Sequence, residues 1–353
     1  MSEIAVQRAL DLFDHASTGS ARSIADLAYE EGLAATRRLE RAEQKRLGQY
    51  MTPVPIARFM AQRAIVSLAR DSIRILDPAA GSGVLGIAAV QAILGVAVPP
   101  KRIELLFCEI DVRLHAALAS AGRQLHAQCA ARGVMLDVQV HGGDFLLSDL
   151  ALSQQPCVDL VIANPPYFKL GKADPRALAH AFAVHGQPNI YGLFMAACAS
   201  LVRPGGVWCF ITPRSWTGGD YFGAVRRHVL TRLHLIAVHV FESRSEHFGD
   251  DEVLQEAVIA WARAGVASAQ VEVGSSSGVS DLHRAAPRRL PVDQVLRRAD
   301  SFRVCLPHAP AGIECLQQSL KAIGLRVFTG PVVAFRAKRW LRAEAGEATV
   351  ALL

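Results

Sequence analysis

The tetrapeptide Asn164-Pro165-Pro166-Tyr167 is the part of the sequence best suited to chemistry, and it directly follows an apolar run. Its two prolines lack backbone N–H groups and fix φ, which leaves the carbonyl of Pro165 without a partner in a strand ladder. That carbonyl and the side-chain oxygen of Asn164 make two acceptors, suited to the two hydrogens of one amino group. Tyr167 adds a ring face on which a planar compound can stack. A chance turn of this composition is the plainer alternative.

Three other polar segments follow apolar runs earlier in the chain: Asp77 to Gly83, Glu109-Ile110-Asp111, and Gly143-Asp144-Phe145. The small residues of the first let a ligand approach the backbone at the start of a helix, where a negative group is favoured. The acid of the second is placed to bind the two hydroxyls of a ribose. Asp144 could accept a hydrogen bond from an adenine amino group while Phe145 packs on the ring. The alternatives are a tight turn, an exposed acid, and a turn aspartate beside a core phenylalanine.

The elements that must position these segments alternate between short apolar runs and helical stretches, which indicates a parallel sheet covered on both faces. We expect Thr52 to cap a helix that begins at Pro53. The run 253–261 could add an edge strand, and the Gly- and Ser-rich segment 264–280 is typical of a linker or a hairpin loop. The expected strands are 73–76, 103–108, 136–141, 160–163, 207–211 and 235–241, and the other expected helices are 3–15, 23–47, 83–95, 112–131, 190–202 and 220–233.

The net charge of +6 is unevenly distributed along the 353 residues. Residues 263–353 contain 13 Lys or Arg and 7 Asp or Glu, whereas the first 262 residues contain 25 of each. A basic region beside a neutral one is typical of proteins that bind a polyanion, most often nucleic acid. A solvated surface helix would give the same excess.

The composition excludes several classes of protein. Hydrophobic residues make up 51% and charged residues 20%, which supplies a core and excludes a disordered or collagen-like chain. The seven cysteines form no Cys-x-x-Cys pair and the twelve histidines no His-x-x-x-His pair, so we expect neither a disulfide framework nor a metal site. The most apolar stretch, 84–100, is only 17 residues long, so no membrane segment is expected. The N-terminus has no signal-peptide pattern, which predicts a cytoplasmic protein.

The order of the polar segments resembles the gamma-class adenine-N6 DNA methyltransferases of bacterial restriction–modification systems, over roughly residues 45–262. Residues 48–53 are similar to the leading motif of that family, 77–83 to its cofactor loop, and 164–167 to its catalytic tetrapeptide. Ala80 stands where cysteine is frequent in the family, a change that should be neutral. The region after residue 262 is shorter than the target-recognition domain that the family often carries.

The resemblance implies an α/β, Rossmann-like fold of S-adenosylmethionine-dependent methyltransferases, with a mostly parallel seven-stranded sheet and helices on both faces. It implies transfer of the methyl group of S-adenosylmethionine to N6 of a flipped-out adenine in double-stranded DNA, without a metal. Asn164, Pro165, Pro166 and Tyr167 would be catalytic, and Tyr167 and Phe248 would stack on the target base. The residues implied to bind the cofactor are Tyr50, Thr52, Asp77, Ala79, Gly81, Gly83, Glu109, Ile110, Asp144, Phe145 and Asn164.

The expected organisation has three parts. Residues 1–47 form an N-terminal helical region, 48–262 the S-adenosylmethionine-dependent catalytic domain, and 263–353 a small basic region. The last region is a candidate for a complete or a partial target-recognition domain. The resemblance also implies a role as the modification enzyme of a restriction–modification system, with a cognate restriction endonuclease as a possible partner.

Two other functions use a similar arrangement. Methyltransferases that act on a translation-factor glutamine or on a base of ribosomal RNA share the tetrapeptide, but they lack a Gln-Tyr-x-Thr-Pro segment, here 49–53, directly before the cofactor loop. A non-catalytic DNA-binding or specificity module on the same fold has no reason to retain all of 164–167. A nicotinamide dehydrogenase is disfavoured because the chain lacks its Gly-x-Gly-x-x-Gly loop.

Overall fold

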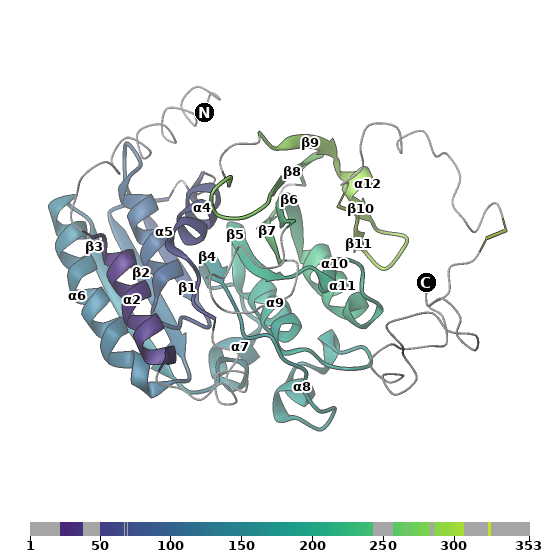
Figure 1. Cartoon of the computed structure of the whole chain (residues 1–353), viewed down its shortest axis with the longest axis horizontal. Helices are drawn as coiled ribbons and strands as arrows, with labels where there is room; N and C mark the ends of the chain where they lie inside the picture. Colours follow the sequence, from purple (N-terminus) through teal and green to yellow (C-terminus); the bar gives the residue numbers. More distant parts are fainter. Residues whose placement is uncertain are drawn as a thin grey trace, which may run out of the picture. The chain divides into compact units, whose positions relative to one another are not determined.

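A nine-stranded sheet flanked by helices organises the computed structural model (Figure 1). The structure describes residues 22–37, 50–66, 68, 70–242, 257–265, 267–282, 286–306 and 324–325. All of these except the last two belong to one compact unit, Met1–Leu306. The strands of the sheet are β1 Ser72–Asp77, β2 Arg102–Glu109, β3 Met135–Gly142, β4 Val158–Ala163, β5 Val202–Pro213, β6 Leu233–Phe241, β7 Ala257–Ala264, β8 Gln270–Ser276 and β9 Arg288–Pro291.

The helices between the strands include most of those expected from the sequence. The longer ones are α2 Ile24–Arg37, α4 Val54–Ile65, α5 Val84–Leu94, α6 His115–Ala131, α9 Ile190–Leu201 and α11 Gly223–Arg232. Short helices are α7 Asp149–Ser153, α8 Pro175–Ala179, α10 Ser215–Gly218 and α12 Val292–Val295, with 3-10 turns η2 Val112–Leu114, η3 Phe145–Leu147, η4 Ala181–Ala183 and η5 Asp220–Phe222. A two-stranded hairpin, β10 Leu296–Arg297 and β11 Arg303–Val304, follows α12.

The strand order β3-β2-β1-β4-β5-β7-β6-β8-β9 explains how the polar segments come together. Strands β3, β2, β1, β4 and β5 pair in parallel, and β7 runs antiparallel between β5 and β6. Strand β8 pairs in parallel with β6, and β9 pairs antiparallel with β8. The predicted mostly parallel α/β sheet is therefore confirmed, and two strands extend it beyond the expected seven.

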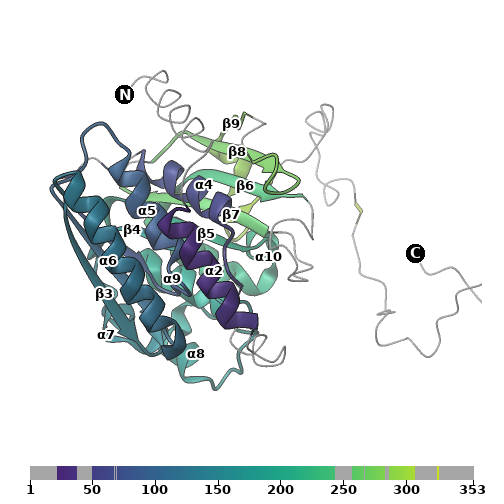
Figure 2. The same ribbon diagram turned by 60° about the vertical axis from the view of Figure 1, so that its left-hand side comes forward.

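Two apolar layers hold the sheet between its helices (Figures 1 and 2). On one side, α4, α5 and α6 pack against the sheet, α2 lies over α5 and α6, and ten of the eleven residues of α5 are buried. On the other side, α9 and α11 pack against β5 and β6 around buried rings such as Trp208 and Phe210, which stack at 4.3 Å. Trp208, Trp216 and Trp261 are all at most 1% exposed and are therefore core residues.

Three local expectations from the sequence were wrong. Residues 257–264 form an interior strand, β7, because their backbone pairs on both sides, with β5 and with β6. Part of the supposed linker 264–280 is strand β8, in which Val271 is fully buried and the glycine and serines lie toward its end. The helix α4 begins at Val54 with Pro53 as its N-cap, so Thr52 does not cap it. The predicted helix 3–15 and residues 38–47 of the predicted helix 23–47 lie outside the described residues.

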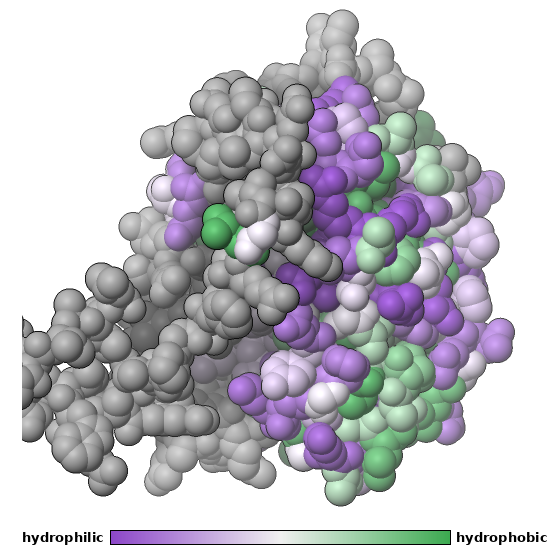
Figure 3. Space-filling model, turned by 90° about the vertical axis from the view of Figure 1, so that its right-hand side faces the viewer, coloured by the Kyte–Doolittle hydropathy of each residue, from purple (hydrophilic) through white to green (hydrophobic). Residues whose placement is uncertain are grey.

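The surface of the described chain carries mixed polarity. Hydrophilic and hydrophobic side chains alternate over the described part of the face drawn in Figure 3, which is the ordinary composition of a protein surface. No helix in the described ranges is both long and apolar enough to cross a lipid bilayer.

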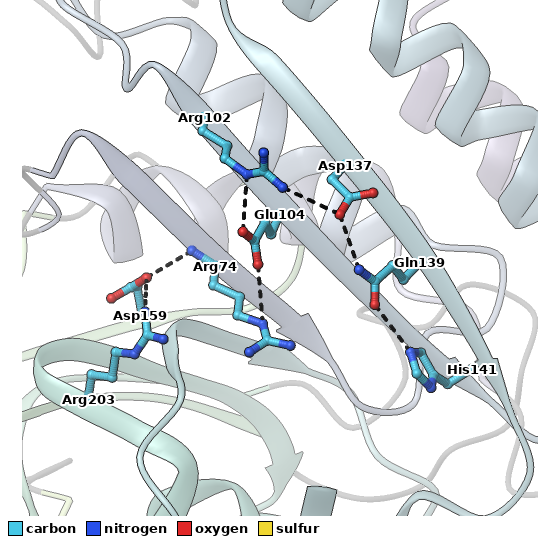
Figure 4. Close-up of polar contacts among 8 residues, drawn as sticks. All are labelled: Arg74, Arg102, Glu104, Asp137, Gln139, His141, Asp159 and Arg203. Atoms are coloured by element: carbon cyan, nitrogen blue, oxygen red, sulfur yellow. Dashed lines mark hydrogen bonds and ion pairs between the residues drawn. The ribbon is translucent and has the colours of Figure 1, made fainter.

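Charged side chains tie the amino ends of the central strands together (Figure 4). Asp159, at the start of β4, is 1% exposed and accepts a hydrogen bond of 2.8 Å from the backbone N–H of Arg74 on β1. The same carboxylate forms ion pairs with Arg70 at 3.1 Å and with Arg203 at 3.3 Å. In contrast, the Arg102–Asp137 pair at 3.7 Å joins two side chains that are each more than 40% exposed.

We expect the substitution Asp159→Asn to lower the free energy of unfolding by about 2–4 kcal/mol, because it removes the buried partner of two arginines. Asp137→Asn, the matched change on the same face, should cost less than about 1 kcal/mol because its ion pair is exposed. Denaturant unfolding of both variants measures the difference. Equal losses would show that Asp159 is not the structural centre of this cluster.

Candidate active site at the carboxyl ends of the strands

The predicted site residues come together at one edge of the sheet. Asp77 ends β1, Glu109 ends β2, Asn164 directly follows β4, and Asp144 comes two residues after β3. The neighbouring order β3-β2-β1-β4 places these four ends side by side. In open α/β sheets, ligands bind outside the carboxyl ends of the strands, so this edge is the candidate active site.

The loop after β1 is built for a close approach of its backbone. Gly81 and Gly83 have φ values of +56° and +89°, a region that residues with a side chain rarely adopt. A Cβ at Gly83 would lie 2.8 Å from the Cδ2 atom of Leu118, so the position has no room for a side chain. Ala79 lies in the same loop and is partly buried against the core beside α9. Helix α5 begins directly after Gly83 and directs its amino end toward this loop.

Two buried carboxyl groups lie beneath this loop. Asp77 is fully buried, and its Oδ2 atom accepts a hydrogen bond of 3.2 Å from the N–H of Gly86. The Oδ1 atom of Asp77 has no hydrogen-bond partner among the described residues. Burial raises the pKa of Asp77 to about 7, and the nearby Glu109 contributes to the same shift. The carboxyl group of Asp77 is therefore partly protonated at neutral pH.

Glu109 connects the end of β2 to the glycine loop. Its Oε2 atom accepts a hydrogen bond of 2.7 Å from the N–H of Gly81, and its Oε1 atom accepts one of 2.8 Å from the N–H of Asp111. The residue is 7% exposed, and burial raises the pKa of its carboxyl group. Ile110, the next residue, is 54% exposed, although it is a large aliphatic side chain. An anchored acid beside an exposed apolar side chain suits a ribose attached to a flat base.

Asp144 and Phe145 lie at the entrance of the turn η3. The Oδ1 atom of Asp144 accepts a hydrogen bond of 3.0 Å from the N–H of Leu146, which caps the turn. The ring of Phe145 is 4% exposed and stacks on Phe194 at 5.4 Å, which is the packing of a core residue. A contact of this ring with a cofactor stays a prediction.

The amide of Asn164 is held by the segment that precedes α4. Its Nδ2 atom donates to the carbonyl oxygen of Tyr50 at 3.1 Å and to the Oγ1 atom of Thr52 at 3.0 Å. Its Oδ1 atom accepts a short hydrogen bond from the hydroxyl of Tyr167. The structure therefore brings the predicted leading motif and the predicted catalytic tetrapeptide into direct contact.

The ring of Tyr167 lies between two other aromatic residues. It stacks with Tyr50 at 6.4 Å between centroids and an interplanar angle of 18°, and it meets Tyr191 edge to face at 6.0 Å. The carbonyl oxygen of Ile211 lies 3.2 Å from the Tyr167 hydroxyl and offers it a second acceptor. Burial raises the pKa of Tyr167 well above its ordinary value, so the hydroxyl keeps its hydrogen at neutral pH.

Two site residues were missed in the sequence. The guanidinium of Arg176, on α8, binds Asp174 at 2.7 Å, lies 3.6 Å from Asp144 and lies over the ring of Phe168. Tyr191, on α9, supports the Tyr167 ring, and its hydroxyl lies 2.7 Å from the Oγ atom of Ser215. The Asp174-Pro175 pair signals a helix start, but no sequence pattern shows that α8 lies beside Asp144. Phe248, predicted as a second stacking residue, lies outside the described residues.

We expect the cofactor-free protein to lose stability as the pH rises through 7. Asp77 ionises near pH 4 in the unfolded chain and near pH 7 in the folded protein, so the stabilisation by its protonated form disappears above pH 7. Linkage gives a loss of about 1 kcal/mol between pH 6 and pH 8. Asp77→Asn should abolish this part of the dependence.

Denaturant unfolding of wild type and Asp77→Asn at both pH values measures the effect. The difference between the two proteins removes the contribution of histidines such as His228, whose pKa burial lowers to about 4. An identical pH dependence in the two proteins would mean that Asp77 is ionised throughout this range.

Comparisons with known proteins identify proteins that this chain resembles. Residues 140–248 match the family model of the Eco57I restriction-modification methylase. The chain is 30% identical to the type II methyltransferase M.BsuBI of Bacillus subtilis over 324 residues, which cover 87% of this chain and 62% of that protein. It is 30% identical to the type II methyltransferase M.PstI of Providencia stuartii over 333 residues, which cover 88% of this chain and 63% of that protein. The chain thus spans about three fifths of the length of these relatives.

The fold has a counterpart of known structure. A protein from Listeria monocytogenes, described as a class I S-adenosylmethionine-dependent methyltransferase, superposes with a TM-score of 0.54 at 18% identity, over 73% of this chain and 74% of that one. The sheet with its antiparallel β7 is therefore the fold of S-adenosylmethionine-dependent methyltransferases. The match of residues 140–248 begins in β3 and includes the tetrapeptide 164–167, so the chain is similar to restriction-modification methylases in the region that carries this motif.

Proposed function

We propose that this protein transfers the methyl group of S-adenosylmethionine to N6 of an adenine in double-stranded DNA, as a modification methyltransferase. The observation that carries the proposal is the orientation of Asn164, whose amide oxygen faces the Tyr167 hydroxyl at the end of β4. An acceptor beside an aromatic ring suits the amino group of a planar base. The relatives named as type II methyltransferases support DNA as the substrate.

The residues of the site fit S-adenosylmethionine. A cradle of acids and backbone is formed by the left-handed Gly81 and Gly83, the anchored Glu109 and the buried Asp77, whose Oδ1 atom has no hydrogen-bond partner in the described part of the chain. We assign the ribose hydroxyls to Glu109 and the base to the space beside the exposed Ile110. Asp144 remains the candidate for the adenine amino group, and the segment of Tyr50 and Thr52 for the methionine part. The cofactor supplies a methyl group on a sulfonium, which is a good leaving group.

The protein contributes position and hydrogen bonds to the reaction. Asn164 accepts one hydrogen of the target amino group through Oδ1, and the carbonyl of Pro165 accepts the other. These bonds would draw the nitrogen lone pair out of conjugation with the ring and direct it toward the methyl group. As the N–C bond forms, the C–S bond of the sulfonium would break, and the nitrogen would release one proton to solvent. Catalysis of this kind depends on orientation and on fixed dipoles, and it requires no nucleophilic side chain.

The target adenine must leave the DNA stack to reach Asn164. Extruding a base costs a few kcal/mol, and stacking on an aromatic side chain recovers about 1–3 kcal/mol per contact. Tyr167 is the candidate for this stacking, and Phe248 is a second candidate from the sequence alone. The basic region 263–353 is proposed to bind the phosphate backbone, which predicts binding that weakens steeply with salt.

The wider context of the reaction extends the same proposal. The modification reaction would protect DNA from a cognate restriction endonuclease, and it would take place in the cytoplasm. The proposal also includes a division of the chain into three parts: a helical region at 1–47, a catalytic domain at 48–262 and a recognition region at 263–353. Within it, Met51 lies beside the described α2, since a Cβ at Gly32 would lie 2.8 Å from its sulfur. The first region therefore reaches the cofactor loop.

The alternative substrates are a translation-factor glutamine or a base of ribosomal RNA, which also present a planar amide or amino group. The contact of Asn164 with Tyr50 and Thr52 favours DNA methylation, because the segment 49–53 distinguishes the DNA enzymes in sequence. A labelled-methyl assay with DNA, RNA and protein substrates separates these functions. Methyl incorporation into RNA or protein, with none into DNA, would overturn the proposal.

We expect Asn164→Ala to reduce methyl incorporation into unmethylated genomic DNA by at least about 100-fold, because it removes an acceptor that acts on the reacting amino group. Binding of S-adenosylmethionine, measured by calorimetry, should remain within a few-fold of wild type. Gln139→Ala, which removes an exposed side-chain amide on β3, is the control and should leave both quantities unchanged. Wild-type methylation by Asn164→Ala would refute the assignment.

We expect Tyr167→Phe and Tyr167→Ala to behave differently. Phenylalanine keeps the stacking ring and removes the hydroxyl that occupies the Asn164 oxygen, so kcat should be retained and KM for DNA should not rise. Alanine loses the stacking contact, and kcat/KM for DNA should fall by about 10-fold to 100-fold. Steady-state kinetics with DNA as the varied substrate measures both. A loss in Tyr167→Phe as large as in Tyr167→Ala would contradict a stacking role for the ring.

A further inference from the structure

We propose that Thr52 is a positioning residue that, with the carbonyl of Tyr50, fixes the orientation of the Asn164 amide so that its oxygen faces the target amino group. The inference rests on the proposed function, because it concerns the same reaction. It adds a second role for Thr52: besides lying in the segment assigned to the cofactor, its hydroxyl orients the side chain of Asn164. The geometry that carries it is the pair of hydrogen bonds from Asn164 Nδ2, at 3.1 Å to Tyr50 and at 3.0 Å to Thr52.

An asparagine amide has two ends of nearly equal size, so its shape does not decide which end faces a substrate. Catalysis by Asn164 requires the oxygen in that place, because an NH2 group would repel the amino hydrogens of the base. The carbonyl of Tyr50 can only accept, so it selects the NH2 end of Asn164 for itself. A reversed amide would bring two oxygens together in a partly buried place and lose a hydrogen bond.

The segment that carries these two acceptors is anchored on both sides. Met51 is 8% exposed, and its sulfur lies 3.7 Å from the Oγ atom of Ser82 in the glycine loop. A Cβ at Gly32 on α2 would lie 2.8 Å from that sulfur, so α2 also packs closely on the segment. Helix α4 begins two residues after Thr52 and packs against α5. The acceptors are therefore held by α2, by the start of α4 and by the cofactor loop.

Thr52 is buried at 5% exposure, and it does not cap α4. Its position before Pro53 suggests a helix cap, but its hydroxyl accepts a hydrogen bond from Asn164 instead. Two acceptors on Nδ2 also polarise the amide and increase the negative charge on Oδ1, because hydrogen bonds in a chain strengthen one another. Loss of the Thr52 acceptor should therefore weaken both the orientation and the basicity of the oxygen.

The test compares Thr52→Val, which replaces the hydroxyl with a methyl group of similar size, with Thr52→Ser, which restores the hydroxyl. We expect Thr52→Val to lower kcat on DNA by about 10-fold or more, and measurement at saturating S-adenosylmethionine separates this loss from any change in the Kd for the cofactor. Thr52→Ser should recover most of the loss. Thr36→Val is the matched control, because it removes a buried threonine hydroxyl that donates to the Gly32 carbonyl and does not touch Asn164.

A second measurement follows the amide itself, without DNA or cofactor. Selective 15N labelling of asparagine shows the side-chain NH2 signals, and those of Asn164 are identified by their absence from Asn164→Ala. We expect slow hydrogen exchange of this NH2 in wild type and Thr52→Ser, and faster exchange in Thr52→Val. This readout does not depend on the substrate, so it separates a failure of the positioning role from a failure of the proposed reaction.

Three results would overturn the inference: an unchanged kcat in Thr52→Val, a raised Kd for the cofactor with an unchanged kcat, or an unchanged exchange rate of the Asn164 amide. If both kcat and Kd change, the exchange rate decides between the two roles. If wild type methylates no DNA, the reaction is wrong, and the exchange rates still show whether Thr52 holds the amide.

Discussion

The parallel pairing of β2, β1 and β4 is the constraint on which the site depends. Asp77 pairs in register with Phe107, and Leu76 pairs with Val161, so the carboxyl ends of the three strands lie at nearly the same level. Each strand then delivers a different polar group to one edge: a buried acid, an anchored acid and an amide. Because these groups come from sequence positions up to 87 residues apart, the sheet register is what brings them to one edge. The short loops after the strands add little freedom.

Burial of Asp77 and Glu109 at this edge disfavours their ionised forms and leaves them suited to bind a ligand that donates hydrogen bonds. Burial raises the pKa of both acids, and the charge of the nearby Glu109 further disfavours ionisation of Asp77. Backbone N–H groups of Gly86, Gly81 and Asp111 offset part of this cost by donating hydrogen bonds. A ligand with hydroxyl groups and a positive centre would offset more of it, because it supplies donors and charge to groups that lack them in the free protein. Burial that disfavours the ionised form of both acids would therefore favour the binding of such a ligand.

The sequence was sufficient where the information is local. The six apolar runs that were expected to be strands are strands, because each is long enough to be buried and is bounded by turn residues. The tetrapeptide 164–167 and the acids Asp77 and Glu109 were found for the same reason: they sit where strands end. Strand pairing is not local, so the sequence of 257–264 does not show that β7 lies in the interior of the sheet. Strand β8 was not predicted because Gly274, Ser275 and Ser276 are typical of a loop. Likewise, the pattern Thr-Pro before a helix indicates a cap, but it cannot show that Asn164 lies beside Thr52, 112 residues away.

The contact between Tyr167 and Asn164 shows how the free site avoids an unsatisfied acceptor. The phenol has one hydrogen and two acceptors in reach, the Asn164 oxygen and the Ile211 carbonyl at 3.2 Å. While no base is present, the hydrogen satisfies Asn164, which would otherwise be left as a partly buried acceptor without a donor. When an amino group arrives, the hydrogen can turn to Ile211, and Asn164 exchanges one donor for another. The exchange would keep the number of hydrogen bonds nearly constant, so in the proposed reaction base binding would not have to overcome the desolvation of Asn164. The energy of stacking on the ring would then be available to oppose the cost of extruding the base.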